Sequence, residues 1–365
     1  MDKFGYMEKF GYEQMCFFHD KNTGLKAITA IHNTVLGPAL GGSRFWNYAH
    51  EDDAIEDALR LARGMTYKSA LAGLALGGGK TVIWGDVDAV RNDPIRREAF
   101  FRAFGRYIEG LNGRYITAAD MNTSTQDMVY INMETDHVVG LPGRSGDPSP
   151  FTARGVFRSI LACCNHVYGS DDMNGKVVAV QGVGAVGYWL CKYLNDVGAK
   201  LIVSDRADLP GGQARLDRVV KEFGATVVDP DTIYGVECDV YAPCAMGATV
   251  NDDTIPQFKC KIVCGGANNV LRDAPIHGKA LQERGIVYAP DYLANAGGVI
   301  NVFYELAEGG YSEEASLRDV DYIYYRMLDI LNVAKATGRL TYAVADELAE
   351  KRIEAVRAIK SIYTH

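Results

Sequence analysis

The chain has 365 residues, of which 48% are hydrophobic and 23% are charged, and its formal net charge is −8. This length suffices for two domains with cores of their own, and the negative charge argues against nucleic acid or an acidic membrane surface as a partner. No apolar run long enough to predict a membrane-spanning helix is present, and we expect no signal peptide. The eight cysteines lack the spacing of zinc ligands, so we expect free thiols in a reducing cytoplasm and no metal site.

The first part of the chain shows the spacing of strands and helices expected of an α/β fold. Apolar runs at 14–18 and 25–32, separated by Asn22-Thr23-Gly24, predict an antiparallel hairpin. Apolar side chains then recur at helical spacing over 53–65, which places Lys68 just beyond the end of a helix. Further predicted elements are a helix over 96–111, a strand over 114–120 that ends in Asp120, and a helix that starts near 123–125.

The segment Leu76-Gly77-Gly78-Gly79-Lys80-Thr81-Val82-Ile83 is the most distinctive part of this region. Its glycines either let the backbone approach a ligand closely or adopt positive φ, and Lys80 follows them at once. A phosphate-binding P-loop is excluded, because its first glycine would stand at position 74, which is Leu74, and because a strand-like run follows Lys80. We therefore interpret Lys80 and Lys68 as two cations that face one small anionic substrate.

Glycine, serine and two prolines mark residues 143–150 as a linker or hinge. A helix predicted over 152–166 leads from this linker into a second unit, and the first strand of that unit is predicted over 176–181. Closure of two domains about such a hinge would exclude water from a site that they share.

A dinucleotide-binding motif follows the strand over 176–181. Gly182, Gly184 and Gly187 form the pattern Gly-x-Gly-x-x-Gly, an amphipathic helix comes next, and Asp205 ends the following strand. The glycines permit close approach of a pyrophosphate, the helix N-terminus favours its charge, and the aspartate suits the ribose hydroxyls. An acid at this position favours NAD over NADP, although Arg206 beside it leaves the preference open.

The remainder of the chain continues the α/β pattern and then becomes helical. Short apolar strands are predicted at 225–228, 239–243, 261–264 and 285–290. Their spacing predicts a doubly wound parallel sheet, whose ligands bind at the carboxyl ends of its strands. The loops at 265–269 and 292–302 are therefore candidates for the site. Two helices are expected over 317–336 and 343–362.

Several motifs together resemble the amino-acid dehydrogenase family that includes glutamate, leucine, phenylalanine and valine dehydrogenases, and within it the leucine-acting members most of all. These motifs are residues 36–44, 64–68, 77–83, 145–150, 182–184 and 295–301. The resemblance implies an α/β fold with two domains separated by a deep cleft. An N-terminal substrate-binding and oligomerisation domain would span 1–145, with helices of about 335–365 packed back on it, and a Rossmann NAD-binding domain would span 146–334.

The resemblance also implies catalytic roles. Lys68 matches the lysine that binds the substrate α-carboxylate, Lys80 the lysine that activates water, and Asp120 the acid that exchanges protons with the amine. Without the resemblance, we would interpret Asp120 as a helix-capping acid. The chemistry agrees with these roles, because a lysine acts as a base only as a neutral amine, which a neighbouring cation and exclusion of water favour.

Binding residues are carried over in the same way. The substrate is expected to contact Leu40, Gly41, Gly42, Ala118, Asn268, Val299 and Val302. The cofactor is expected to contact Thr152, Gly182, Gly184, Ala185, Val186, Gly187, Asp205, Arg206, Ala242, Cys244 and Asn268. Asn269 is the less favoured choice beside Asn268. Phe45 and Phe151 depart from the family pattern and could reshape the substrate pocket.

These observations predict NAD-dependent, reversible oxidative deamination of branched-chain L-amino acids to 2-oxo acids and ammonia. A methylene or two in an aliphatic pocket changes binding by only about 1–3 kcal/mol, so activity on leucine, isoleucine and valine should overlap. The alternative within the enzymes is an aromatic amino-acid dehydrogenase, and outside them a redox-inactive NAD sensor. The family resemblance implies a symmetric homo-oligomer, with an octamer favoured.

Overall fold

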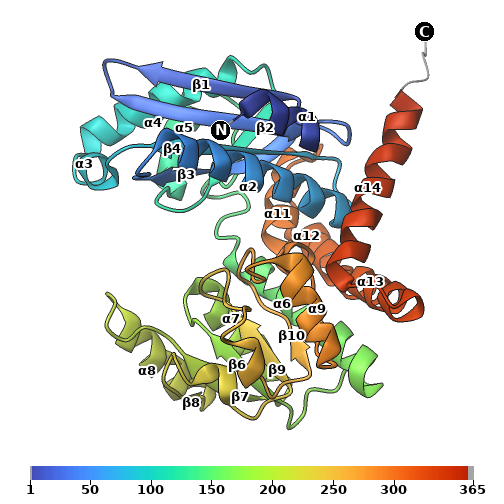
Figure 1. Cartoon of the computed structure of the whole chain (residues 1–365). Coiled ribbons are helices and arrows are strands. Elements are labelled where there is room, and N and C mark those ends of the chain that lie inside the picture. Colours follow the sequence, from blue (N-terminus) through green and yellow to red (C-terminus); the bar gives the residue numbers. More distant parts are fainter. Residues whose placement is uncertain (1, 361–365) are drawn as a thin grey trace. The chain divides into compact units, whose positions relative to one another are not determined.

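The computed structural model describes residues 2–360, with only the backbone of Lys360, and it forms two compact units (Figure 1). Unit 1 contains the chain up to Asp147, the segment Val302–Glu313, and the chain from Ala349 onward. Unit 2 contains Pro148–Asn301 and Glu314–Leu348. The chain therefore returns to unit 1 twice. The expected limits of the substrate and cofactor domains, at 145/146 and at 334, stay predictions.

Unit 1 is built on a five-stranded sheet with the order β1-β2-β4-β3-β5. The strands are β1 (Gln14–Asp20), β2 (Leu25–Asn33), β3 (Ala39–Trp46), β4 (Gly77–Trp84) and β5 (Tyr115–Ala119). The predicted hairpin of β1 and β2 is confirmed, β2 also pairs antiparallel with β4, and β3 runs parallel to both β4 and β5. Strand β3 was not evident from the sequence, because its glycines have low strand propensity.

Helices cover both faces of this sheet. They are α1 (Lys3–Phe10), α2 (Glu51–Leu71), α3 (Val87–Arg91), α4 (Pro94–Glu109) and α5 (Thr125–Asn132). Helix α2 continues past the predicted end at residue 65, because Thr66, Ser69 and Leu71 extend its buried side. Lys68 therefore lies inside the last turn of α2, and the prediction that it follows the helix is wrong.

The two faces of the sheet have separate apolar cores. Helix α2 packs Ile55 and Leu59 against Val82 of β4 on one face. On the other face, α4 packs Phe100 and Phe101 against Phe45 of β3, with the Phe45 ring centroid 5.3 Å from that of Phe100. Phe45 is fully buried in this core, where it packs the fold, and its effect on a substrate pocket stays a prediction.

Unit 2 contains a six-stranded sheet with the order β11-β10-β9-β6-β7-β8, and all of its pairs are parallel. The strands are β6 (Val177–Gln181), β7 (Lys200–Ser204), β8 (Thr226–Val227), β9 (Val240–Pro243), β10 (Ile262–Val263) and β11 (Val287–Tyr288). The strand order reverses between β6 and β9, which is the topology of a doubly wound nucleotide-binding fold. The predicted fold class is therefore confirmed.

The remaining helices belong mainly to unit 2. They are α6 (Ser149–Tyr168), α7 (Ala185–Asp196), α8 (Gly212–Phe223), α9 (Ala274–Glu283), α10 (Asp291–Ala294), α11 (Gly297–Phe303), α12 (Glu313–Asp321), α13 (Ile323–Thr337) and α14 (Thr341–Lys360). Short 3-10 turns occur at Ile233–Gly235, Ile255–Gln257 and Tyr304–Leu306.

The prediction of one helix over 317–336 is wrong, because α12 ends at Asp321 and α13 begins at Ile323. Two arginines of α6 hold this break. Arg154 forms two hydrogen bonds of 2.7 Å with the Asp321 carboxylate, and Arg158 donates to the Asp321 carbonyl at 3.4 Å. The predicted end of the last helix, residue 362, lies outside the described residues.

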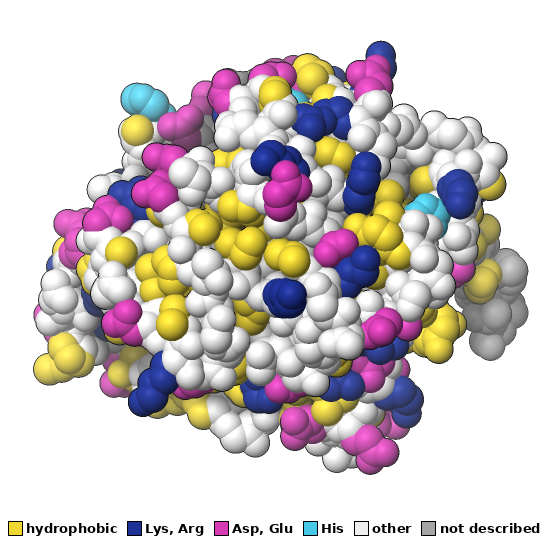
Figure 2. Space-filling model, turned by 90° about the horizontal axis from the view of Figure 1, so that it is seen from below, with side chains coloured by type: hydrophobic (Ala, Val, Ile, Leu, Met, Phe, Trp, Pro, Cys, Tyr) yellow, Lys and Arg dark blue, Asp and Glu magenta, His cyan; other side chains and the backbone are white. Residues whose placement is uncertain are grey.

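Residues 2–360 include no helix with the length and hydropathy needed to cross a membrane. On the face shown in Figure 2, basic and acidic side chains are interspersed, with apolar side chains visible between them.

Candidate active site

Lys80 and Asp120 form an ion pair in unit 1, with Lys80 Nζ 2.7 Å from Asp120 Oδ2. Lys80 lies on β4 and is only 6% exposed, whereas Asp120 follows β5. Strand β3 lies between these two strands. Gly42 of β3 makes the pair possible, because a Cβ at this position would lie 2.8 Å from the Asp120 Cβ. The missing side chain thus lets Asp120 lie across the middle strand and reach Lys80.

The glycines that precede Lys80 serve the packing of the protein itself. A Cβ on Gly78 would lie 2.1 Å from the Thr66 backbone nitrogen of α2, and one on Gly79 would lie 2.7 Å from the Tyr115 ring. Neither has positive φ. The expectation of positive φ is therefore wrong at these positions, and the expectation that the run approaches a ligand stays a prediction. Their role is to bring α2, which carries Lys68, close to the strand that carries Lys80.

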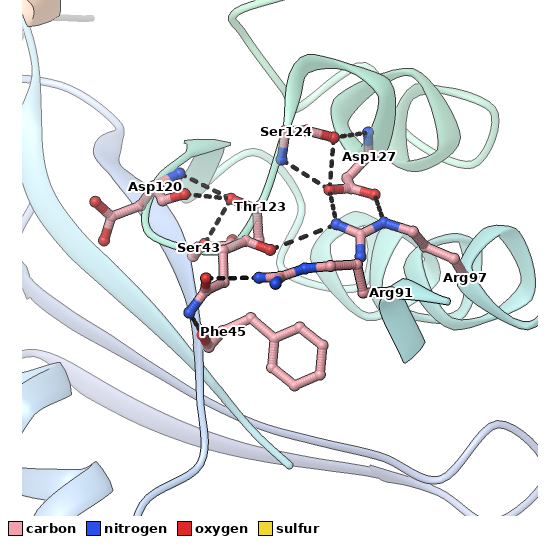
Figure 3. Close-up of polar contacts among 9 residues, drawn as sticks. Ser43, Phe45, Arg91, Arg97, Asp120, Thr123, Ser124 and Asp127 are labelled. Atoms are coloured by element: carbon pink, nitrogen blue, oxygen red, sulfur yellow. Dashed lines mark hydrogen bonds and ion pairs between the residues drawn. The ribbon is translucent and has the colours of Figure 1, made fainter. Parts of the chain in front are cut away.

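The turn that carries Asp120 is fixed to β3 by Thr123 (Figure 3). The Asp120 backbone N–H donates to Thr123 Oγ1 at 2.8 Å, and this hydroxyl lies 3.0 Å from the Ser43 carbonyl oxygen and 2.9 Å from the Asp120 carbonyl oxygen. Asn122 of the same turn donates to the Phe45 carbonyl at 3.0 Å. Asp120 is thus placed by backbone contacts to the strand that separates it from Lys80.

A buried ion pair lies beside the same turn, at the start of α5 (Figure 3). Asp127 is fully buried and accepts two hydrogen bonds of 2.6 Å from Arg97 of α4. Ser124 is the N-cap of α5 and forms a reciprocal capping box with Asp127. The predicted helix start is confirmed, and the alternative that Asp120 itself caps this helix is wrong.

Two cations act on the Asp120 carboxylate. Burial alone would raise its pKa, but Lys80 and Arg44 outweigh burial and lower the pKa to about 2. Arg44 Nε lies 3.2 Å from Asp120 Oδ2, the same oxygen that Lys80 contacts. Arg44 was not singled out from the sequence. The available signal was its position two residues after Gly42, which places both on the same face of β3.

The other expected substrate residues of unit 1 lie on β3, β5 and α2. Gly42 pairs with Ala118 of β5, and Leu40 pairs with both Ile116 and Gly78. Leu40 is buried and Ala118 is partly exposed. Lys68 is partly buried in the last turn of α2. The contact of these residues with a substrate stays a prediction.

The glycine motif of unit 2 forms a tight turn between β6 and α7. Gly182 has a φ of +90°, Gly184 is the N-cap of α7, and a Cβ on Gly187 would lie 2.0 Å from the Gly182 carbonyl oxygen. Ala185 and Val186 form the first turn of α7. The turn therefore requires Gly182 and Gly187, whereas a Cβ on Gly184 would meet no atom within 4 Å. This open space leaves the backbone at the helix N-terminus accessible to close approach by a phosphate.

Asp205 lies immediately after β7, beside this turn. It accepts a hydrogen bond from the Val183 backbone N–H at 3.2 Å and pairs with Arg215 of α8 at 3.0 Å. Arg206 makes two hydrogen bonds with Asp208, of 2.7 and 2.6 Å. Arg215 is a further residue that the sequence did not indicate, since it reaches Asp205 from another element.

The other expected cofactor residues occupy the ends of strands and helices in unit 2. Thr152 lies in the first turn of α6, and a Cβ on Gly298 of α11 would lie 2.6 Å from its hydroxyl. Ala242 and Cys244 lie at the carboxyl end of β9. Burial raises the pKa of the Cys244 thiol to about 12, which disfavours a nucleophilic thiolate.

Asn268 follows β10 and is exposed, and Asn295 Nδ2 donates to Asn268 Oδ1 at 2.8 Å. The Asn295 Oδ1 atom is buried and has no hydrogen-bond partner among residues 2–360. Asn269, the less favoured choice, has a φ of +52°. Val299 and Val302 are both buried on α11, which crosses from unit 2 to unit 1.

The parallel sheet of unit 2, with a glycine turn at a helix N-terminus and an acid after the next strand, is the architecture of a dinucleotide-dependent oxidoreductase. A family model described as the Glu/Leu/Phe/Val dehydrogenase dimerisation domain matches residues 12–137, and one described as Glutamate/Leucine/Phenylalanine/Valine dehydrogenase matches residues 211–356. The chain belongs to this family and is an amino-acid dehydrogenase.

Similar proteins of known name span the whole chain. A leucine dehydrogenase of Bacillus cereus is 55% identical over 100% of this chain and 96% of its own length. A leucine dehydrogenase of Geobacillus stearothermophilus is 54% identical over 99% of this chain and 96% of its own. The crystal structure of L-tryptophan dehydrogenase from Nostoc punctiforme matches with a TM-score of 0.82 and 42% identity, over 97% of this chain and 99% of that one.

Proposed function

We propose that this chain catalyses the NAD-dependent, reversible oxidative deamination of L-leucine and related branched-chain L-amino acids to 2-oxo acids and ammonia. The observation that carries the proposal is the pair of the buried Lys80 with Asp120, whose charged atoms lie 2.7 Å apart across Gly42. Leucine dehydrogenases are 54–55% identical to the chain, whereas tryptophan and phenylalanine dehydrogenases are 43% identical. This difference favours a branched-chain over an aromatic substrate.

Unit 2 has the features that a dinucleotide requires. The glycines of the turn, Gly182, Gly184 and Gly187, have no side chain to block a pyrophosphate, and Asp205 offers a carboxylate to ribose hydroxyls. The buried Asn295 Oδ1, without a partner among the described residues, suits an amide donor. When bound, NAD supplies the acceptor for the hydride that leaves the substrate Cα.

The side chains of unit 1 would perform the proton transfers. Lys68 binds the substrate carboxylate as a point charge. Lys80, as the neutral amine, removes a proton from the water that attacks the imino carbon, and Asp120 exchanges protons with the amino nitrogen. The hydrogen bonds from Thr123 and Asn122 fix the Asp120 turn before the substrate arrives, so little reorganisation is needed.

The aliphatic set Leu40, Ala118, Val299 and Val302 would form the side-chain pocket, which supports the preference for branched substrates. A symmetric homo-octamer is the favoured assembly, and the match of residues 12–137 to a dimerisation domain supports self-association. The eight cysteines are all free, which suits a reducing cytoplasm.

Oxidation of candidate amino acids tests the proposed function directly. NADH absorbance should rise with NAD and L-leucine, L-valine or L-isoleucine, and much less with L-phenylalanine, L-tryptophan or L-glutamate. No NADH with any amino acid would refute the enzyme, and a strong preference for phenylalanine or tryptophan would refute the branched-chain assignment.

Coenzyme preference should depend on Asp205. Replacing it with serine removes the charge that would repel a 2′-phosphate and releases Arg215 from its 3.0 Å pair. We expect the ratio of kcat/KM for NADP to that for NAD to rise about 100-fold, the effect of one charged hydrogen bond gained and one repulsion lost. Asp196→Ser, which breaks the Lys192–Asp196 pair at the end of α7 farthest from the glycine turn, serves as the matched control and should change this ratio far less. An unchanged ratio in Asp205→Ser would show that Asp205 does not select the coenzyme.

A further inference from the structure

Arg44 connects the Lys80–Asp120 pair to a second carboxylate, that of Asp57. Its Nε lies 3.2 Å from Asp120 Oδ2, and its Nη1 lies 2.9 Å from Asp57 Oδ2. The Tyr48 hydroxyl donates to the same Asp57 oxygen at 2.5 Å. The guanidinium is therefore fixed between two anions instead of being free to turn toward solvent.

The sheet and α2 determine the geometry of these contacts of Arg44. Arg44 and Gly42 share the face of β3 that α2 covers, and Asp57 projects from α2 toward this face. Tyr48 follows β3, and its backbone carbonyl accepts a hydrogen bond of 2.9 Å from the Trp84 indole of β4. The anchor of Arg44 is thus built from the same strands that position the Lys80–Asp120 pair.

The charges around the pair are unequal. Asp120 faces two cations, Lys80 and Arg44, whereas Arg44 faces Asp120, Asp57 and the neutral Tyr48 hydroxyl. Burial lowers the pKa of Arg44, but the two carboxylates outweigh burial and raise it above its usual value, so Arg44 stays charged. A permanent positive charge beside Asp120 opposes the presence of a second one on Lys80.

We propose that Arg44 is a positioning residue, anchored by Asp57 and Tyr48, that holds Asp120 as an anion and makes the Lys80–Asp120 pair release its proton at lower pH. The inference rests on the proposed function, because it assigns to Arg44 the adjustment of the base that this function needs. Arg44 donates to the Asp120 oxygen that Lys80 also contacts, and so it competes with the Lys80 ammonium for that oxygen.

The first test is the pH dependence of kcat/KM for L-leucine oxidation. The acid limb is the part of this profile in which kcat/KM rises with pH. Replacing Arg44 with glutamine removes the charge, so the acid limb should move to higher pH by about one unit. Arg44→Lys keeps the charge but cannot reach Asp57 and Asp120 together. Its acid limb should stay within about 0.3 pH unit of the parent enzyme while kcat falls.

The second test removes the opposing charge. Asp57→Asn should move the acid limb downward, because Arg44 then acts on the pair without its other anion. A merely structural role for Arg44 predicts lower activity with no shift in either variant, and this result would overturn the proposal. A shift of both variants in the same direction would overturn it as well.

Thermal unfolding and gel filtration of each variant establish that it is folded. If Arg44→Gln does not fold, the pH profiles of Arg44→Lys and Asp57→Asn decide the question, because both variants retain a cation at position 44. The proposal then requires a downward shift of the acid limb in Asp57→Asn and almost no shift in Arg44→Lys. The two proposals fail differently. An unaltered enzyme without any leucine-dependent NADH formation would refute the proposed function, whereas an active enzyme with unshifted variants refutes only the role of Arg44.

Discussion

Replacing Lys80 with alanine is expected to lower kcat for L-leucine oxidation by about a thousand-fold, the usual effect of losing a general base. The variant should fold, because Asp120 keeps its 3.2 Å contact with Arg44 and is not left as an unpaired buried charge. The glycine turn and Asp205 belong to unit 2, whereas Lys80 belongs to unit 1. We therefore expect the dissociation constant for NAD, measured by fluorescence titration, to change less than about threefold.

Lys26 offers a matched control for Lys80. It lies on the neighbouring strand β2 and is exposed, and its Nζ lies 5.4 Å from the centroid of the Trp84 ring. Lys26→Ala removes a lysine from the same sheet and should retain near-normal kcat. If Lys80→Ala kept kcat within about tenfold of the parent value, the base would have to be another residue.

The pH of these assays determines whether Asp120 is ionised and stabilises the fold. The pKa of Asp120 in the folded chain is about 2, below its ordinary value of 3.8. A lowered carboxyl pKa stabilises the fold above the ordinary value, and this stabilisation is lost as the pH falls from about 4 through 2. Activity measured at neutral or alkaline pH therefore reports on proton transfer and not on acid unfolding of unit 1.

The sequence predicted the dinucleotide site better than the lysine site, and the reason is physical. Gly182, Gly187 and Asp205 belong to one strand–turn–helix–strand segment, whose geometry is set by local backbone rules. Arg215 reaches Asp205 from the next helix, and nothing in the local sequence fixes that contact.

The lysine site depends on contacts between distant elements. Lys80 and Asp120 meet only because β3 lies between β4 and β5, and strand order cannot be derived from the spacing of apolar residues. Arg44 and Thr123 act through the same arrangement, which explains why neither was recognised. The packing role of the glycine run was missed for a related reason, since its close neighbours Thr66 and Tyr115 are distant in the sequence.

The second large effect is expected at Gly41, which shares β3 with Gly42. A Cβ at this position would lie 1.8 Å from the Gly79 carbonyl oxygen and 3.3 Å from the Lys80 Cα. Backbone atoms of a neighbouring strand cannot move aside as a flexible side chain can. Gly41→Ala must therefore push β4 away from β3, and we expect the free energy of unfolding to fall by about 3 kcal/mol or more.

The displacement in Gly41→Ala would occur at the residue before Lys80, so activity should be lost even in the fraction that remains folded. Chemical denaturation at fixed protein concentration measures the first effect, and kcat per folded subunit measures the second. Gly64→Ala is the matched control, because Gly64 lies within α2 and a Cβ there meets no atom within 4 Å. Alanine at that helical position should raise the free energy of unfolding by about 0.5–1 kcal/mol. A Gly41→Ala protein with the denaturation midpoint and kcat of the parent would contradict the close backbone packing of β3 and β4 on which the Lys80–Asp120 pair depends.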